Sequence, residues 1–215
     1  MNEPFPALRE DIYRLLAACY YSPTPAFLEE RCCANLAELL LPVAPETAAF
    51  AAEAAALAAD ESAEELSVEH ARLFIGPFQL VAPPYGSYYL EQRTVMGDST
   101  ESVADFYAGS GLQLAEDFHD LADHITAELE FMSFLAFNER QAEQAANGEE
   151  ARRFAGLQRE FLERFLLPWV EPFTSAVVTD ADSPFYCAVA RCTNAFVQGD
   201  YLALAKDQDE RHRQA

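Results

Sequence analysis

The sequence predicts an all-α protein, a compact bundle of roughly nine to ten helices. Apolar residues recur at helical spacing along most of the chain, and alternating strand-like stretches are nearly absent. Proline and glycine divide the periodic segments at short intervals, as they do between the helices of a bundle. Apolar residue types make up 51% of the 215 residues, which is enough to form a hydrophobic core.

Four helices are expected before the first long interruption of the pattern. In the first, Ile12, Leu15, Leu16 and Cys19 form one apolar face, and prolines interrupt the pattern after it. Ser62 and Glu65 have the spacing of a capping box, which predicts the start of the fourth helix. The expected spans are 7–21, a second helix ending at 41, 47–59 and 62–74.

A long stretch over 76–94, rich in proline and tyrosine, is expected to be non-helical and to act as a hinge or binding loop. It divides the chain into N-terminal helices (1–75), the loop (76–98) and C-terminal helices (99–215). The later helices are expected over 98–107, 120–145, 149–167, 170–178, 183–197 and from 200 onward.

Polar residues and prolines set the expected ends of these later helices. Asp98, Ser99 or Thr100 is expected to cap the first of them. In the longest helix Asp120 is the expected N-cap, which would place Asp123 at the third position. The further expected boundaries are a stop at Pro168, an N-cap at Ser183 before Pro184, and a cap at Asp200.

Charge is the strongest compositional signal. Thirty-six acidic residues against fourteen basic ones give a formal net charge of −22, and Lys206 is the only lysine. Such a surface repels nucleic acid and anionic membranes and favours a basic partner, although acidity can also serve solubility alone. The N-terminal residues lack the pattern of a secretory signal, and no apolar run is long enough to span a bilayer. A cytoplasmic location without stable membrane insertion is therefore expected.

The five cysteines are expected to be free thiols. Their odd number and the lack of a Cys-x-x-Cys pair argue against a disulfide framework and a zinc site. Most of them lie in apolar helical patterns, where a buried thiol acts as a small hydrophobe. A reducing compartment suits all five.

A histidine and a carboxylate are predicted on one apolar helix face, where His124 and Glu128 are four residues apart. Because burying either group unpaired is costly, they are expected to pair with each other or with a partner. Four interpretations stay open: a structural pair, a polar anchor in a binding groove, an acid–base site, or a metal site. A di-iron bundle needs two Glu-x-x-His motifs, and only one is present, at Glu116 and His119.

The segment 81–90 is the second notable feature. Pro83 and Pro84 stiffen it, and Tyr85, Tyr88 and Tyr89 offer a large amphipathic contact surface. These aromatic residues either bind a partner or close over the core. Phosphate-binding loops and nucleophile motifs were not found in the sequence, which disfavours an enzyme.

Six stretches, in order, resemble the TorD/DmsD/NarJ family of redox-enzyme maturation chaperones. Similarity is dense between Glu69 and Val197 and thin before that. Departures are Gly86, where many members carry glutamate, and the absence of a loop tryptophan, since the only one is Trp169. The stretches are ARLFIGP (71–77), PPYGSYY (83–89), MGDST (96–100), DHITAELEFM (123–132), FLLPW (165–169) and SPFY (183–186).

The resemblance implies a TorD-like helical fold and a chaperone that catalyses nothing itself. Such proteins bind the twin-arginine signal peptide of an apo molybdoenzyme subunit, assist cofactor insertion and proofread before export. The client carries a molybdopterin guanine dinucleotide cofactor, whereas no cofactor, metal or nucleotide is expected in this chain. The resemblance also implies a monomer or a domain-swapped homodimer with the loop as hinge.

The expected peptide-binding residues come from the loop and from the start of the longest helix. An acidic groove with aromatic walls would suit both the basic head and the apolar tail of a signal peptide. Two alternatives remain: a NarJ-type assembly chaperone whose client is not exported, and a small helical metalloprotein using His119 and His124. The expected binding residues are Phe78, Pro84, Tyr85, Ser87, Tyr88, Tyr89, Asp123, His124 and Glu128.

Overall fold

The computed structural model describes residues 5–76, 81–112 and 120–214, with side chains described for 8–76, 81–112 and 120–207. Within these ranges the regular structure is helical, apart from one isolated antiparallel bridge between Tyr85 and His124. The predicted all-α class is confirmed. In the described ranges no helix combines the length and apolarity needed to cross a membrane.

Five α-helices and one π-helical turn form within residues 5–76. The capping box is confirmed, since the Ser62 N–H donates to Glu65 Oε2 (2.8 Å) and the Glu65 N–H to Ser62 Oγ (3.2 Å). The predicted second helix is wrong as one element, because Arg31 has a left-handed backbone (φ 52°) that breaks it in two. The elements are α1 (Phe5–Ala18), α2 (Pro25–Glu29), α3 (Cys32–Leu40), α4 (Pro45–Ala58), α5 (Ala63–His70) and the π-turn η1 (Ala71–Ile75).

The described residues of the C-terminal part form six α-helices and a second π-helical turn. The expectation that 76–94 lacks helix is wrong, because a short helix forms within it directly after Tyr85. The elements are α6 (Gly86–Leu90), α7 (Asp98–Gly109), α8 (Ile125–Gln144), α9 (Gly148–Phe161), the π-turn η2 (Leu162–Leu166), α10 (Leu167–Asp180) and α11 (Pro184–Gln214).

Pro168 and Asp200 do not have the roles predicted for them. Pro168 lies in the first turn of α10, directly after η2, and the chain stays helical through it. The π-turn shifts the hydrogen-bond register just before Pro168, so the missing N–H of proline costs little there. Asp200 lies inside the continuous helix α11 and is buried, because it pairs with α1 rather than capping a new helix. The predicted N-cap Ser183 is confirmed by the hydrogen bond from the Phe185 N–H (3.2 Å).

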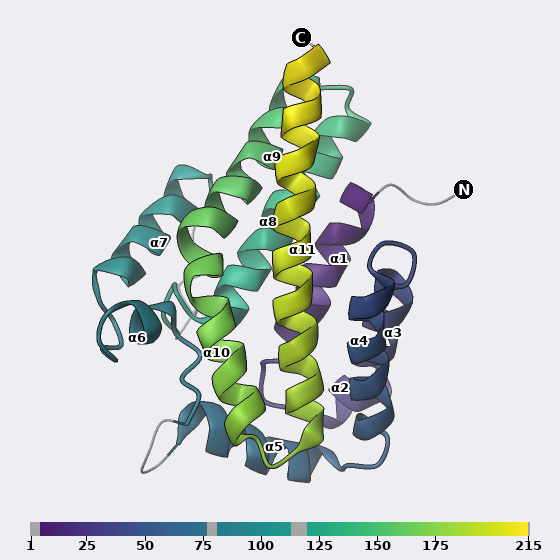
Figure 1. Cartoon of the computed structure of the whole chain (residues 1–215), viewed down its shortest axis with the longest axis vertical. Coiled ribbons are helices and arrows are strands. Elements are labelled where there is room, and N and C mark those ends of the chain that lie inside the picture. Colours follow the sequence, from purple (N-terminus) through teal and green to yellow (C-terminus); the bar gives the residue numbers. More distant parts are fainter. Residues whose placement is uncertain (1–4, 77–80, 113–119, 215) are drawn as a thin grey trace.

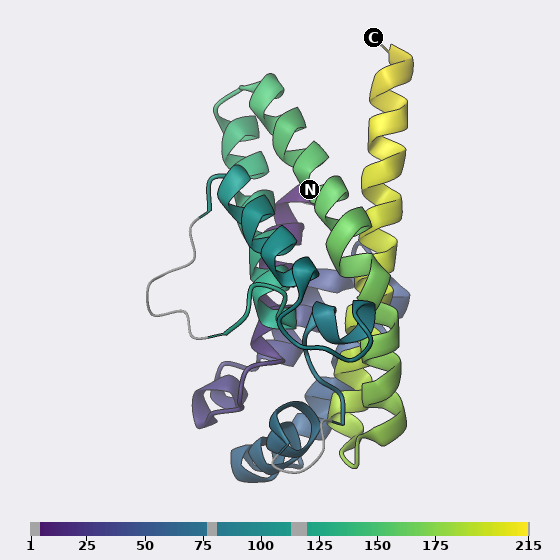
Figure 2. The same cartoon turned by 90° about the vertical axis from the view of Figure 1, so that its left-hand side faces the viewer.

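Helices from the two ends of the sequence pack against each other. In Figure 1, α11 runs along the middle of the molecule, with α3 and α4 on one side and α10 on the other. The most extensive contacts join α1 to α8, α8 to α9, α11 to α4 and α3 to α4. Figure 2, turned by 90°, shows α11 beside α9 and α10 and rising past them towards the C-terminus. The core centres on large buried side chains, including Trp169, Tyr13, Phe131, Phe161, Phe173 and Phe196.

A buried ionic group, here called the Arg9 cluster, fastens the bundle. The Arg9 guanidinium lies 2.7 Å from Asp200 Oδ1 and 3.4 Å from Glu139 Oε2. Tyr13 donates to Asp200 (2.9 Å), and Gln158 donates to Glu139 (2.7 Å). All five side chains are buried, so the cluster ties α1, α8, α9 and α11 together by charge-assisted hydrogen bonds.

Candidate functional site

The two segments singled out in the sequence meet in space. The Ile125 N–H donates to the carbonyl of Pro84, and the Gly86 N–H donates to the carbonyl of Asp123, each at 2.9 Å. These two hydrogen bonds flank the bridge between Tyr85 and His124. The loop and the start of α8 therefore form one unit, here called the junction (84–91 with 120–130).

Asp123 holds the loop in place from a buried position. Its Oδ2 accepts a hydrogen bond from the Ser87 N–H at 2.7 Å, and only 1% of the residue is exposed. Its Oδ1 is also buried and has no hydrogen-bond partner among the described residues. The Ser87 hydroxyl in turn accepts from the Met96 N–H at 3.2 Å. Asp123 and Ser87 thus shape the loop, and peptide contact by either one stays a prediction.

His124, and not Asp120, is the N-cap of α8. The backbone of His124 is extended (φ −71°, ψ 140°) because it pairs with Tyr85, so the helix cannot begin earlier. Its Nδ1 accepts from the Thr126 N–H at 3.2 Å and lies 2.6 Å from Thr126 Oγ1. Asp123 consequently precedes the cap, and its expected place at the third helical position is wrong.

His124 and Glu128 do not pair with each other. His124 Nε2 lies 3.6 Å from Asp120 Oδ2, while Glu128 Oε2 accepts a hydrogen bond from Trp169 Nε1 at 3.2 Å. Burial raises the pKa of Glu128 well above its ordinary value, because the charged form is disfavoured in the core. Burial also lowers the pKa of His124. Both environments favour the neutral form of the side chain.

Trp169 packs against the loop from the core side. The ring of Tyr89 stacks on it, with ring centroids 5.9 Å apart. A Cβ atom at Gly86 would lie 3.0 Å from Trp169 Nε1, so a larger residue there would have to displace the indole. The indole therefore joins Glu128 on α8 to Gly86 and Tyr89 on α6. Sequence reasoning placed Trp169 only in a C-terminal marker, because its partners are distant in the chain.

Two exposed carboxylates and two tyrosines lie at the outer edge of the junction, and this group of Tyr21, Tyr85, Asp120 and Glu130 is called the acidic rim. The ring of Tyr85 meets His124 edge-on at 5.1 Å. Burial, followed by the charge of Asp120 and a hydrogen bond to it, raises the pKa of Tyr85 to about 12. Tyr21 donates to Glu130 Oε1 at 2.7 Å. Burial, followed by this hydrogen bond, raises the pKa of Tyr21 to about 12 as well.

The far end of the loop is fastened to α7 by Glu91. Its carboxylate accepts from the Asp98 N–H (3.1 Å) and the Ser99 N–H (2.7 Å), so the first turn of α7 is capped from outside. The expected cap at 98–100 is therefore wrong, and Gly97 occupies the N-cap position. A Cβ atom at Gly97 would lie 1.8 Å from Glu91 Oε2, so a larger residue there would displace this carboxylate from its capping position.

The other predicted site residues differ in exposure. Pro84 is buried, whereas Tyr88 and Tyr89 are half-buried and meet edge-on at 5.2 Å. Phe78 lies outside the described residues. So does His119, which the metalloprotein alternative needs. Among the described residues no group of three histidine, cysteine or acidic side chains is placed to hold a metal ion.

Comparison with known families decides the assignment. The family model described as nitrate reductase delta subunit matches residues 41–175, which is more than half of the chain. The chain belongs to this family. The match covers the whole loop, the start of α8 and Trp169, and thus every described residue of the junction.

Individual relatives of the chain confirm the predicted resemblance to the TorD/DmsD/NarJ family. The chain is 31% identical over 148 residues to the Tat proofreading chaperone DmsD of Salmonella typhimurium, covering 68% of this chain and 66% of that protein. It is 26% identical over 148 residues to the chaperone protein TorD of Vibrio cholerae, covering 69% and 66%. The chain thus spans just under two thirds of these relatives. Both are named as chaperones, which supports the prediction that the chain is not an enzyme.

A solved structure shares the fold. A proposed redox enzyme maturation protein from Archaeoglobus fulgidus superposes with a TM-score of 0.62 at 23% identity. The superposition covers 92% of this chain and 96% of that one. It therefore includes the helices on both sides of the junction.

Proposed function

We propose that the chain is a cytoplasmic chaperone that binds the twin-arginine signal peptide of an apo molybdoenzyme subunit. It holds the client while the molybdenum cofactor is inserted and withholds it from export until then. The observation that carries the proposal is the acidic rim at the outer edge of the junction. Support also comes from the chaperone relatives of the family.

The acidic rim has the chemistry to accept arginine. A guanidinium forms paired hydrogen bonds with carboxylates and stacks on aromatic rings, and the rim offers both kinds of partner. Asp120 and Glu130 are exposed, and in the described part of the chain the structure shows neither in an ion pair with arginine or lysine. The formal net charge of −22 adds a long-range attraction for a basic peptide.

The apolar part of a signal peptide has a surface beside the same loop. Leu90 is 43% exposed and Met96 is 69% exposed. Both flank the turn that Ser87 and Glu91 hold in place, and half-buried Tyr88 lies on α6 with Leu90. Met side chains adapt to varied apolar partners, which suits a leader without a fixed shape.

The buried position of Asp123 determines which substitutions can test the proposal. Replacing Asp123 removes an acceptor that holds the Ser87 N–H, so lost binding would be confounded with a displaced loop. Asp120 is exposed and belongs to the acidic rim, so Asp120→Asn removes charge with little effect on the fold. Asp105, exposed on α7, provides a matched control as Asp105→Asn.

The experiment is calorimetric titration with the signal peptide of a molybdoenzyme encoded beside this protein. We expect saturable binding, weakened by Asp120→Asn and by replacement of the peptide's two arginines with lysines, and unchanged by Asp105→Asn. Added salt should weaken the binding only in part, because the apolar contacts are not screened. Binding that is insensitive to Asp120→Asn would remove the acidic rim from the site. No binding to the peptide or to the full apo subunit would overturn the proposed function.

An assembly chaperone for a non-exported client is the second candidate, favoured by the nitrate reductase delta subunit description of the family model. Such a protein would bind the mature apo subunit and ignore a detached leader peptide. Titration with an apo subunit lacking its leader separates the two candidates. We also propose that the chain carries no cofactor or metal of its own. Stoichiometric metal in the purified protein would contradict that and revive the metalloprotein alternative.

A further inference from the structure

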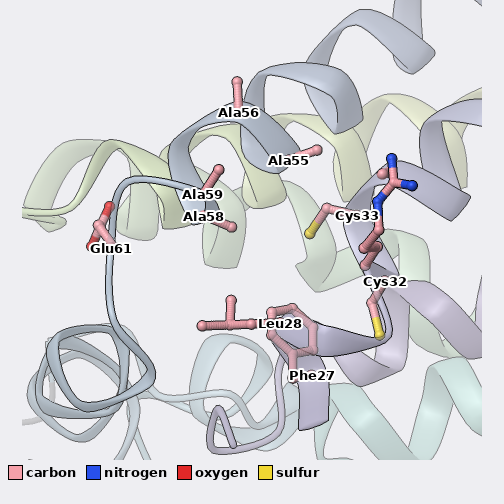
Figure 3. A pocket seen from close by; sticks show the side chains of 11 residues that line it. Phe27, Leu28, Cys32, Cys33, Ala55, Ala56, Ala58, Ala59 and Glu61 are labelled. Atoms are coloured by element: carbon pink, nitrogen blue, oxygen red, sulfur yellow. The ribbon is translucent and has the colours of Figure 1, made fainter. Parts of the chain in front are cut away.

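A pocket of about 510 Å³ opens between the α2–α3 region and the C-terminal end of α4, far from the junction in the fold. Phe27 and Leu28 form one wall and alanines of α4 form another, as Figure 3 shows. The side chain of Cys33 points into this hollow, towards Leu28 and Ala58. A small molecule can therefore reach a thiol that is only 4% exposed in total.

A second thiol lies directly behind the first. Cys19 Sγ is 3.8 Å from Cys33 Sγ, and Cys19 is buried just after the end of α1. The hydrogen bond with Cys33, together with burial, raises the pKa of Cys19, so Cys19 keeps its proton while Cys33 faces the pocket. A thiol that faces a pocket, with a second thiol 3.8 Å behind it, can form a mixed disulfide that the second thiol resolves.

We propose that this pocket is a modification site for low-molecular-weight disulfides, with Cys33 as the attacking thiol and Cys19 as the resolving thiol. Cys33 loses its proton to water, and its thiolate attacks one sulfur of the incoming disulfide, forms a mixed disulfide and releases one thiolate. Cys19 then loses its proton to water and attacks the Cys33 sulfur, which releases the second thiolate. The two protein thiols are oxidised to a Cys19–Cys33 disulfide, and the incoming disulfide is reduced to two thiols.

The pocket contributes space for the group that the incoming disulfide carries. Its volume is suited to a small organic substituent, which must sit beside Leu28 and Ala58 while Cys33 is in the mixed disulfide. The resulting bond would link the end of α1 to the first turn of α3, two elements that already pack together. Of the remaining thiols, Cys32 lines the same pocket and Cys192 is buried near Cys33, whereas the thiol of Cys187 on α11 contacts the Val178 carbonyl at 3.8 Å.

The test uses the full-length, reduced protein and dithiobis(nitrobenzoic acid), whose released thiolate is coloured. In protein whose partly exposed Cys187 is replaced by serine, we expect two coloured thiolates per chain in a fast phase, no reagent left on the protein, and a Cys19–Cys33 linkage in non-reducing peptide mapping. Cys19→Ser should release one thiolate in that phase and keep the reagent on Cys33. Cys33→Ser in the same Cys187→Ser background should lose the fast phase entirely.

Access through the pocket is tested without altering a thiol. Ala58→Phe fills the hollow and should slow the fast phase several-fold, while Ala52→Phe, on the exposed face of α4, should not. Circular dichroism of each variant confirms that it is folded. The proposal is overturned if the reagent stays on wild-type Cys33, if Cys33 joins Cys192 or Cys32 instead, or if thiolate release requires unfolding.

Discussion

The Arg9 cluster and the junction both bury ionisable groups, yet they differ in how the charge is balanced. In the Arg9 cluster one guanidinium lies between two carboxylates, and these carboxylates raise the pKa of Arg9 although burial opposes it. In the junction, Asp123 and Glu128 are buried with neutral partners, namely the Ser87 N–H and the Trp169 indole. Balanced charge lets the first region hold the helices together. In the second region burial favours the neutral form of Glu128, and the exposed carboxylates of the acidic rim provide the negative charge that suits a cationic partner.

The largest expected effect would come from removing the cation of the balanced region. Arg9→Met removes the guanidinium that lies 2.7 Å from the buried carboxylate of Asp200, so the free energy of unfolding should fall by about 3–5 kcal/mol. Urea denaturation measures it. The control is Arg14→Met, which removes an exposed pair with Asp11 and should cost less than about 1 kcal/mol. Equal losses in the two variants would remove the distinction between the Arg9 cluster and a surface ion pair.

The next effect distinguishes the junction by its pH dependence. The folded-state pKa of Glu128 is raised, so the folded protein holds this proton more tightly than the unfolded chain. The stabilisation is therefore present below the unfolded pKa of about 4.3 and is lost as pH rises through the folded pKa, by at most about 1.4 kcal/mol per pH unit. Glu128→Gln removes this pH dependence. The free energy of unfolding of the variant should therefore increase relative to that of wild type as pH rises. A difference in unfolding free energy that is constant from about pH 5 to pH 8 would contradict it.

A smaller, local effect is expected where the loop meets α7. Gly97→Ala places a Cβ atom where the Glu91 carboxylate lies, so the first turn of α7 should lose its cap. Hydrogen exchange at the Asp98 and Ser99 amides should become several-fold faster, while α9 should be unchanged. The control Gly109→Ala adds a methyl group where nothing lies within 4 Å and should leave those two amides protected.

The smallest effect on stability is expected at the acidic rim. Asp120→Asn should change the free energy of unfolding by no more than about 0.5 kcal/mol, because the side chain is exposed. The same variant should bind the twin-arginine peptide more weakly. Urea denaturation and titration of one protein preparation compare the two quantities directly. A marked loss of stability would show that Asp120 stabilises the start of α8 and does not belong to the binding surface.

Local sequence rules predicted the features whose causes are local. The capping box at Ser62 and the cap at Ser183 follow from neighbouring residues, and both are present. The family resemblance, and not a local rule, predicted that the loop and the start of α8 belong to one site, and the structure joins them. Their part in peptide binding stays a prediction, since the structure contains no partner.

Features that depend on distant partners could not be predicted in this way. Asp200 has the local pattern of a cap, but Arg9, its partner, is 191 residues away in sequence. Glu91 caps a helix that begins after it, and Tyr21 meets Glu130 across 109 residues. His124 became the cap because Tyr85 holds its backbone extended, which no property of the α8 sequence indicates.

The π-turn η2 also sets the rotational phase of everything that follows it. A π-turn accommodates one residue more than an α-helical turn, and each residue advances a helix by about 100°. If the same residues 162–166 wound as a regular α-helix, the extra residue would be taken up as additional rotation, and α10 would turn by about that angle. Trp169 would then turn away from Glu128 and Gly86. The loop would lose its packing against the indole, while α10 itself stayed helical. The one extra residue in this turn therefore sets the orientation of α10 that places the Trp169 indole against the loop.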